Sequence, residues 1–180
     1  MDDRRSVKTK RAIREAFLEL LKHKSINRIS IVEISNRADL GRGTFYLHYK
    51  DVYDLMEHLE NELISNLEKL YDASFPFDNS MNMLKLTDTI TEYLESNRET
   101  FLLLSRTENG SRILEKLRQF FIRKLLSDNG DAVTETDTVE AVFIVSGVLG
   151  VLETWLRDDI KTSHKSISEL LHHELMKFDN

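Results

Sequence analysis

The sequence predicts an all-α protein of about nine helices, and three observations lead to this expectation. Its 180 residues include one proline and six glycines, so breaks in the chain are few. Apolar residues recur at spacings of three and four positions, whereas the alternation of a β-strand is rare. Two Ser-x-x-Glu sequences, at Ser30 and Ser166, have the form of capping boxes, which begin helices.

The first fifty residues are expected to form three helices and one domain. The first helix has an apolar stripe and should end near residues 23–25; the stripe consists of Ile13, Ala16, Phe17, Leu20 and Leu21. The capping box at Ser30 begins a helix of about two turns, which Leu40-Gly41 interrupts. A further short helix should follow over residues 42–49.

The remaining residues, 51–180, form the second predicted domain, made of longer helices. A helix from Asp51 carries leucines at helical spacing and should stop before residues 74–79, where Pro76 marks the expected joint. Helices are then expected over residues 84–96, 98–106, 111–126, 135–159 and 166–178.

Charge is divided unevenly between the two predicted domains. The whole chain has a net charge of −6, but residues 1–50 contain 12 Lys and Arg against 6 Asp and Glu, a net charge of +6. The rest has 13 against 25, a net charge of −12. A basic domain joined to an acidic one is expected where only the basic part contacts phosphates, as in a nucleic-acid-binding protein. A chance cluster of solvated charges is the alternative.

Several classes of function are disfavoured. The chain has no cysteine, which excludes disulfides and thiolate sites. It lacks a glycine-rich phosphate loop and a His-Glu-x-x-His motif; His58 and Glu62 share a helix face, but such pairs are most often surface contacts. We therefore expect no enzyme, metal or cofactor. No signal-peptide core is found, and the run from Ala141 to Leu152 is short for a membrane span, so a cytoplasmic protein is expected.

The pattern over residues 30–51 predicts a helix-turn-helix. A capped short helix, a tight break at Leu40-Gly41 and a second short helix can present the second helix to the major groove of DNA, while the first braces against the backbone. Gly43, near the start of the second helix, permits close approach to DNA. The side chains that follow it include a hydroxyl, a phenol and an imidazole, which can bind base edges or phosphates.

These residues resemble the signature of TetR-family transcription regulators. Arg42-Gly43-Thr44-Phe45-Tyr46-Leu47-His48-Tyr49-Lys50-Asp51 follows Ile34-Ser35-Asn36-Arg37-Ala38-Asp39-Leu40, and the likeness covers about residues 8–59. The resemblance implies a three-helix DNA-binding head joined to a helical ligand-binding and dimerisation domain. It also implies a repressor that binds a palindromic operator as a homodimer. Two turn positions depart from the family pattern: Asp39, where glycine is usual, and Lys24-Ser25, where glycine often ends the first helix.

The resemblance also implies which residues contact DNA. Arg42, Thr44 and Tyr46 should face base edges or flanking phosphates. His48, Lys50 and Ser30 should contact phosphates. With Gly43, the implied DNA-binding set is Ser30, Arg42, Gly43, Thr44, Tyr46, His48 and Lys50. Phe45 should instead anchor the helix in the core, and for Leu47 and Tyr49 both DNA contact and packing remain open.

The stretch from Ala141 to Leu152 predicts a dimer. It is apolar on nearly all faces of a helix, which requires burial on two sides. One side can be core, and the other is best explained by the same helix in a second subunit; a central core helix in a monomer is the alternative. Residues 145–156 also resemble the C-terminal domain of a Firmicutes-type branch of the family. With the final helix included, the predicted interface contains Gly147, Gly150, Leu171 and Leu175.

Aromatic residues of the second domain are the candidate lining of a ligand pocket, although such residues are often plain core. They are Tyr71, Tyr93, Phe101, Phe120, Phe121, Phe143 and Trp155. The predicted function is a DNA-binding regulator whose release from DNA is gated by a small ligand. The alternative is a co-regulator of the same fold whose second domain binds a protein. An apolar cavity would favour the ligand, and a filled core with an exposed apolar patch would favour the protein.

Overall fold

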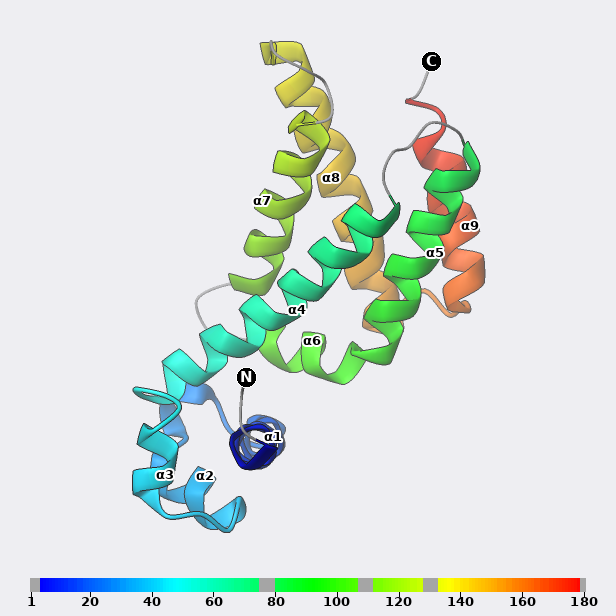
Figure 1. Ribbon diagram of the computed structural model, residues 1–180. Coiled ribbons are helices and arrows are strands. Elements are labelled where there is room, and N and C mark those ends of the chain that lie inside the picture. Colours follow the sequence, from blue (N-terminus) through cyan, green and yellow to red (C-terminus); the bar gives the residue numbers. More distant parts are fainter. Residues whose placement is uncertain (1–3, 75–79, 107–111, 128–132, 179–180) are drawn as a thin grey trace. The chain divides into compact units, whose positions relative to one another are not determined.

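The computed structural model describes residues 4–74, 80–106, 112–127 and 133–178. Within these residues the chain forms nine α-helices, one short 3-10 helix (Ile26–Arg28) and no strand, which confirms the all-α prediction (Figure 1). The chain divides into two compact units, residues 1–63 with 103–111 and residues 64–102 with 112–180. The first unit thus extends past residue 50. The expected joint at residues 74–79 lies, beyond Ser74, outside the described residues.

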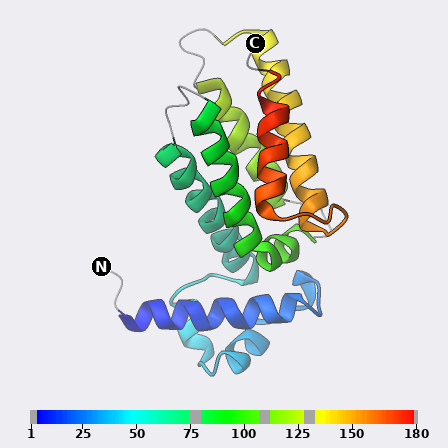
Figure 2. The ribbon, with the colours of Figure 1, turned by 90° about the vertical axis from the view of Figure 1, so that its right-hand side faces the viewer.

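The first unit is built mainly from three helices and the beginning of a fourth. They are α1 (Arg4–Leu21), α2 (Ile31–Arg37), α3 (Arg42–Tyr46) and the first part of α4 (Val52–Ser74). α1 packs on α2, and α2 packs on α3 (Figure 2). The core consists of side chains that are at most 2% exposed, among them Ile13, Phe17, Ile34, Phe45, Leu55 and Leu59. These residues include part of the predicted α1 stripe and the predicted anchor Phe45.

The second unit contains five further helices and the end of α4. The helices are α5 (Ser80–Ser96), α6 (Arg98–Ser105), α7 (Arg112–Ser127), α8 (Glu135–Leu156) and α9 (His164–Leu175), although the last residues of α6 belong to the first unit. α5 lies along α9, and α7 lies along α8 (Figures 1 and 2). Trp155 is almost completely buried, and its indole nitrogen donates to the carbonyl of Thr162, 2.9 Å away, which fixes the connection between α8 and α9.

The helix starts show one prediction that is confirmed and one that is wrong. Ser30 caps α2 in a complete capping box with Glu33. Ser166 caps no helix, because α9 begins earlier and its cap is Ser163, whose hydroxyl accepts from the Ser166 amide at 3.2 Å. A second complete box, which the sequence reading missed, caps α8 and pairs Thr134 with Asp137.

α8 is unusual in both composition and exposure. Among the described helices it alone has the length and apolar composition of a membrane span, with a mean hydropathy of 1.7. Here it is packed inside the second unit, where Ala141, Val145, Leu149 and Leu152 are buried. Only 33% of its most apolar window is buried, however, so this helix also has an apolar face that the unit leaves uncovered.

Candidate nucleic-acid interface and apolar pocket

The turn between α2 and α3 is closed by two backbone hydrogen bonds. The Leu40 amide donates to the Ser35 carbonyl at 2.9 Å, and the Asp39 amide donates to the Asn36 carbonyl at 3.3 Å. This is a Schellman motif, whose residue after the helix cap takes the left-handed conformation. Asp39 does so, with φ at 53°. Aspartate tolerates this conformation better than most residues, so the turn forms without the glycine that is usual in the family.

The other departure from the family pattern has no conformational cost at Ser25. That residue is extended, with φ at −70°, and therefore needs no glycine. α1 ends at Leu21, slightly before the expected residues 23–25, because the amides of His23 and Lys24 both donate to the carbonyl of Leu20 and close the last turn.

The start of α2 is held by a local network around Glu33. The Ser30 hydroxyl accepts from the Glu33 amide at 3.3 Å, and the Glu33 carboxylate accepts from the Ser30 amide at 3.0 Å. Lys24 forms an ion pair with the same carboxylate. These partners, Lys24 first and then Ser30, lower the pKa of Glu33 to about 2. The network fixes the start of α2 and occupies the Ser30 amide.

α3 presents its polar residues outward around a buried anchor. Phe45 is completely buried, whereas Tyr46 is 59% exposed. Arg42 and Gly43 are also exposed, and Thr44 is half-buried. A Cβ placed on Gly43 would meet no atom within 4 Å, so the fold itself does not require a glycine there.

The residues after α3 form a tight turn rather than the predicted continuation of the helix. The amides of His48 and Tyr49 both donate to the Phe45 carbonyl, at 2.9 and 3.0 Å. Tyr49 is 6% exposed and Leu47 is 80% exposed, so Tyr49 packs and Leu47 does not. The turn leaves His48 half-buried and Lys50 exposed.

Tyr49 joins α3 to the start of α4. Its ring centroid lies 5.7 Å from that of Phe45 and 5.3 Å from that of His58 in α4. Burial raises the pKa of Tyr49, so this phenol stays neutral at physiological pH. The Lys50 amide donates to the Asp54 carboxylate at 2.8 Å, and the Asp54 amide donates to Asp51 at 2.8 Å, which caps α4.

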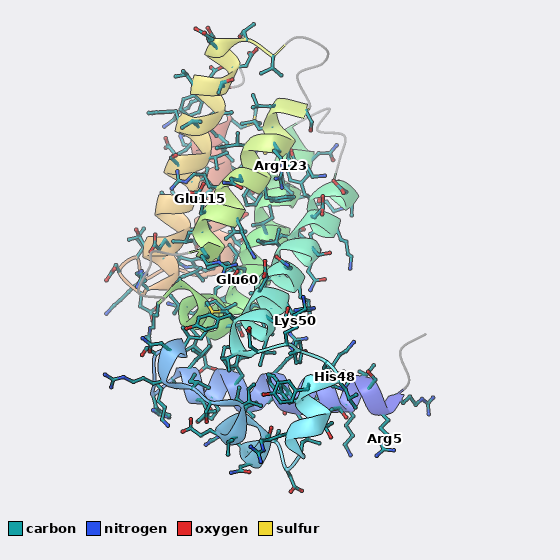
Figure 3. The ribbon with its side chains drawn as sticks, turned by 90° about the vertical axis from the view of Figure 1, so that its left-hand side faces the viewer. Arg5, His48, Lys50, Glu60, Glu115 and Arg123 are labelled. Carbon is teal, nitrogen blue, oxygen red and sulfur yellow. The ribbon has the colours of Figure 1, made fainter. Side chains whose placement is uncertain are left out.

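The seven residues that the resemblance assigned to DNA contact all lie in the first unit, and none is buried. His58, for which the sequence predicts a surface contact, hydrogen-bonds to the Asp54 carbonyl at 2.8 Å. Its i+4 neighbour Glu62 instead accepts two hydrogen bonds from Arg14. Figure 3 shows Arg5, which sequence reasoning did not assign, at the same end of this unit as His48. Only its position at the basic start of α1 could have indicated it.

The second unit contains an apolar pocket of about 130 Å³. Its lining residues come from α4, α5, α7, α8 and α9: Tyr71, Met83, Leu86, Thr87, Ile90, Thr91, Phe121, Leu125, Ile144, Val145, Val148, Leu149, Leu152, Leu171 and Leu175. Of the seven aromatic residues predicted to line a pocket, Tyr71 and Phe121 do so. Most of the lining is aliphatic, whereas the lining residues predicted from the sequence were all aromatic.

The other five aromatic residues lie elsewhere. Phe101, Phe120 and Trp155 are buried in the core, and Tyr93 is half-buried beside Phe101, with 6.4 Å between ring centroids. Phe143 is 66% exposed on α8, because it lies on the helix face opposite to the buried residues.

The four residues predicted for a dimer interface fall into two groups. Gly147 and Gly150 are exposed on α8, and a Cβ on either would meet no atom within 4 Å. Leu171 is 5% exposed and lines the pocket with Leu175, so its side chain lies inside the unit rather than on its surface. Its neighbour Leu170 is 57% exposed.

Two features of this chain are typical of helix-turn-helix transcription regulators. The first unit contains a helix-turn-helix with exposed polar residues, and the second is a helical unit with an apolar pocket. Residues 81–177 match a TetR family whose description is "Transcriptional regulator C-terminal region". The match spans more than half of the chain, which therefore belongs to the TetR family of transcription regulators, a family of regulators rather than enzymes.

Individual relatives agree with this assignment. The chain is 22% identical over 161 residues to the uncharacterized HTH-type transcriptional regulator YxbF of Bacillus subtilis (strain 168), covering 87% of this chain and 42% of that protein. It is 32% identical over 93 residues to the HTH-type transcriptional regulator AcrR of Shigella flexneri, covering 47% of this chain and 43% of that protein. The matched part is thus less than half the length of these two relatives.

Solved structures share the fold. NalD, the secondary repressor of the MexAB-OprM multidrug efflux pump in Pseudomonas aeruginosa, has a TM-score of 0.71 and 20% identity, with 97% of each chain covered. FadR from Bacillus subtilis in complex with stearoyl-CoA has a TM-score of 0.65 and 15% identity, with 90% of this chain and 95% of that chain covered.

Proposed function

We propose that the chain is a cytoplasmic repressor that binds a palindromic operator in double-stranded DNA as a homodimer, and that a small ligand in the pocket of the second unit releases it. The arrangement of α3 carries the proposal. Phe45 and Tyr49 point inward and hold a short helix, whose outward residues Arg42, Gly43, Thr44 and Tyr46 are accessible to a major groove.

Charge supports DNA as the partner of the first unit. Residues 1–50 have a net charge of +6 in a chain whose total is −6. Cations on this unit neutralise phosphates, and the released counterions favour binding at low salt. His48 and Lys50 follow α3 directly and are the proposed phosphate contacts, together with Ser30 at the start of the brace.

The uncovered face of α8 supports the dimer. Val139 is 69% exposed and Phe143 is 66% exposed, and both glycines of this helix lie in open space. A large apolar face on a soluble protein requires a partner, and a two-fold axis gives the same face to both chains. We propose that Leu170, rather than the buried Leu171 predicted from the sequence, lies in the interface with Gly147 and Gly150.

The pocket supports a small-molecule effector, and the exposed face of α8 is the observation that favours the alternative of a protein partner. A co-regulator would cover α8 with another protein. The oligomeric state of the purified chain distinguishes the two functions. In a dimer the second copy covers the exposed face of α8, whereas in a stable monomer this face is available to a different protein.

The placement of the recognition helix is tested by substituting its outward residues. Operator fragments are first selected from genomic DNA by binding and identified by sequencing. We expect Thr44→Ala and Tyr46→Ala to lower operator affinity about tenfold or more, since a good base contact contributes about 1–3 kcal/mol. Tyr53→Ala is the matched control, because this tyrosine is 53% exposed on α4 and is not in the proposed contact set. Wild-type affinity and specificity in both α3 variants would show that α3 does not read DNA.

The phosphate contacts are tested by the salt dependence of binding. The logarithm of affinity should fall with the logarithm of salt concentration, with a slope of about −0.9 for each phosphate neutralised. Lys50→Ala should flatten the slope by about one unit per contact in each subunit and weaken all sequences equally. Lys161→Ala, at an exposed position of the second unit, is the control that should leave it unchanged. A slope near zero in the wild type would contradict the proposal.

A further inference from the structure

We propose that the pocket of the second unit binds a compact, uncharged apolar molecule about the size of one aromatic ring with a short neutral tail, and that it discriminates against anions. This inference rests on the proposed effector role of the pocket and extends it to the chemical class of the ligand. Three properties of the pocket support it: the lining, the volume and the charge at one end.

The lining has no charged side chain and few free polar groups. Apart from the Tyr71 phenol, its polar groups are the hydroxyls of Thr87 and Thr91. Thr87 donates to the Leu84 carbonyl at 2.9 Å, and Thr91 donates to the Thr87 carbonyl at 2.8 Å. A charged group placed among these residues would lose its hydration without gaining an ion pair, which strongly disfavours it.

The volume limits the size of the apolar part. The pocket measures about 130 Å³. A cavity of roughly 150 Å³ lined by Leu, Ile and Phe takes one benzene molecule. The pocket itself therefore fits a single ring, with a tail that extends out of it.

Negative charge lies at one end of the pocket. An adjoining groove of about 200 Å³ shares four lining residues with it and also contacts Asp137 and Glu140; the shared residues are Met83, Leu125, Ile144 and Leu175. Asp137 accepts from the amide and the hydroxyl of Thr134, at 2.8 and 2.7 Å, and these bonds lower the pKa of its carboxyl group. Both bonds keep this carboxylate ionised, so an anionic tail in the groove meets like charge.

The cation beside the lining does not offset this charge. Lys124 of α7 lies 5.6 Å from the ring centroid of Tyr71. Its ammonium group is already bound to Asp72 at 2.6 Å and lies 3.6 Å from Glu68, both on α4. Because two carboxylates neutralise it, Lys124 offers no free positive charge to an anionic ligand.

The test compares two probes with the same hydrocarbon body, 4-phenylbutan-1-ol and 4-phenylbutanoate. Isothermal titration calorimetry is carried out on the full chain without DNA. We expect the alcohol to bind at least tenfold more tightly than the carboxylate. Equal or tighter binding of the carboxylate, or no binding of the alcohol, would overturn the inference.

Two variants show whether binding occurs in this pocket. Val145→Phe places a ring among the lining residues and should weaken alcohol binding at least tenfold. Val148→Phe places a ring at a second lining position and should have the same effect, which keeps the test valid if Val145→Phe unfolds at a lower temperature. Val133→Phe is the matched control, because Val133 is 49% exposed and is not in the lining. Folded Val145→Phe and Val148→Phe proteins that both bind the alcohol like wild type would overturn the assignment.

A third variant tests the charge selection. Glu140→Gln should strengthen binding of the carboxylate about threefold and leave the alcohol unchanged, whereas Glu169→Gln, exposed on α9, should change neither. An unchanged ratio of the two affinities in Glu140→Gln would contradict the charge selection. Operator release is measured separately: alcohol binding in the pocket without release supports this inference and contradicts the proposed gating function.

Discussion

The fold does not require glycine at position 43, whereas DNA binding under the proposed function does. A Cβ at this position meets nothing within 4 Å in the single chain. Alanine is the better helix former by up to about 1 kcal/mol. We therefore expect Gly43→Ala to keep or slightly raise the free energy of unfolding, and to weaken operator binding about tenfold, because its methyl group occupies space that the DNA backbone approaches. Urea unfolding and fluorescence anisotropy with labelled operator measure the two effects. Unchanged affinity would show that DNA does not approach α3 here.

Asp39 shows how one residue can depart from the family pattern and preserve the geometry. Its φ of 53° lies in the left-handed region. Alanine there lacks the polar side chain that eases this conformation, so we expect Asp39→Ala to lower the free energy of unfolding by about 1 kcal/mol relative to Asp39→Gly. Asn36→Ala, one turn earlier and also exposed, is the control. Equal stability of the alanine and glycine variants, measured by urea unfolding, would contradict a strained turn.

At the scale of an element, the structure explains which helix starts could be predicted. The box at Ser30 forms because Ser30 and Glu33 satisfy each other locally. The similar sequence at Ser166 does not cap a helix, because Ser163 lies three residues earlier and accepts from the Ser166 amide itself. The motif is therefore not sufficient to begin a helix: its success depends on whether an earlier residue can cap first.

The capping network of α2 predicts a dependence of stability on pH. Partners of Glu33 hold its pKa at about 2, below its ordinary value of 4.5. A lowered folded-state pKa stabilises the fold fully above the unfolded value, and the contribution is lost as pH falls through the folded value. We expect Glu33→Gln to be less stable than wild type at pH 6, with the difference shrinking between pH values of about 4.5 and 2. Urea unfolding at each pH tests this, and a constant difference across the range would contradict it.

The pocket shows why residue type alone predicts a lining poorly. Leu170 and Leu171 are neighbours about 100° apart on α9, and only packing decides that Leu171 points inward. Phe143 and Phe121 are both aromatic, yet Phe143 is exposed and Phe121 lines the pocket. The sequence could indicate apolar helices, but the inward face of each depends on contacts between distant segments.

For the whole molecule, α4 is the element that both compact units share. Its residues up to 63 belong to the first unit, and those from 64 onward belong to the second. Its start is capped by Asp51, shortly after α3, and Tyr71 near its end lines the pocket. Under the proposed function, a ligand that displaces Tyr71 would contact the same helix that follows the proposed recognition residues in the chain. This continuity gives the proposed gating a physical route.

For the whole molecule, a substitution at Gly150 tests whether the chain forms a dimer through α8. In the single chain a side chain at Gly150 meets nothing within 4 Å, so Gly150→Leu should leave the fold intact. In a dimer that pairs α8 with its copy, leucine separates the helices, and overpacking costs about 1–3 kcal/mol. That range corresponds to a dimer dissociation constant raised about five- to 150-fold. Operator affinity should fall with it, because two half-sites require two linked heads.

Analytical ultracentrifugation of wild type and Gly150→Leu, with operator binding measured in parallel, tests this prediction. Circular dichroism should show the same helical content in both proteins, which separates a failure to assemble from a failure to fold. Glu92→Leu adds the same side chain at an exposed position of α5 outside the proposed interface, and should change neither measurement. A wild type that sediments as a monomer and still binds a single half-site tightly would show that recognition does not depend on assembly, and the uncovered face of α8 would then be left for a different protein.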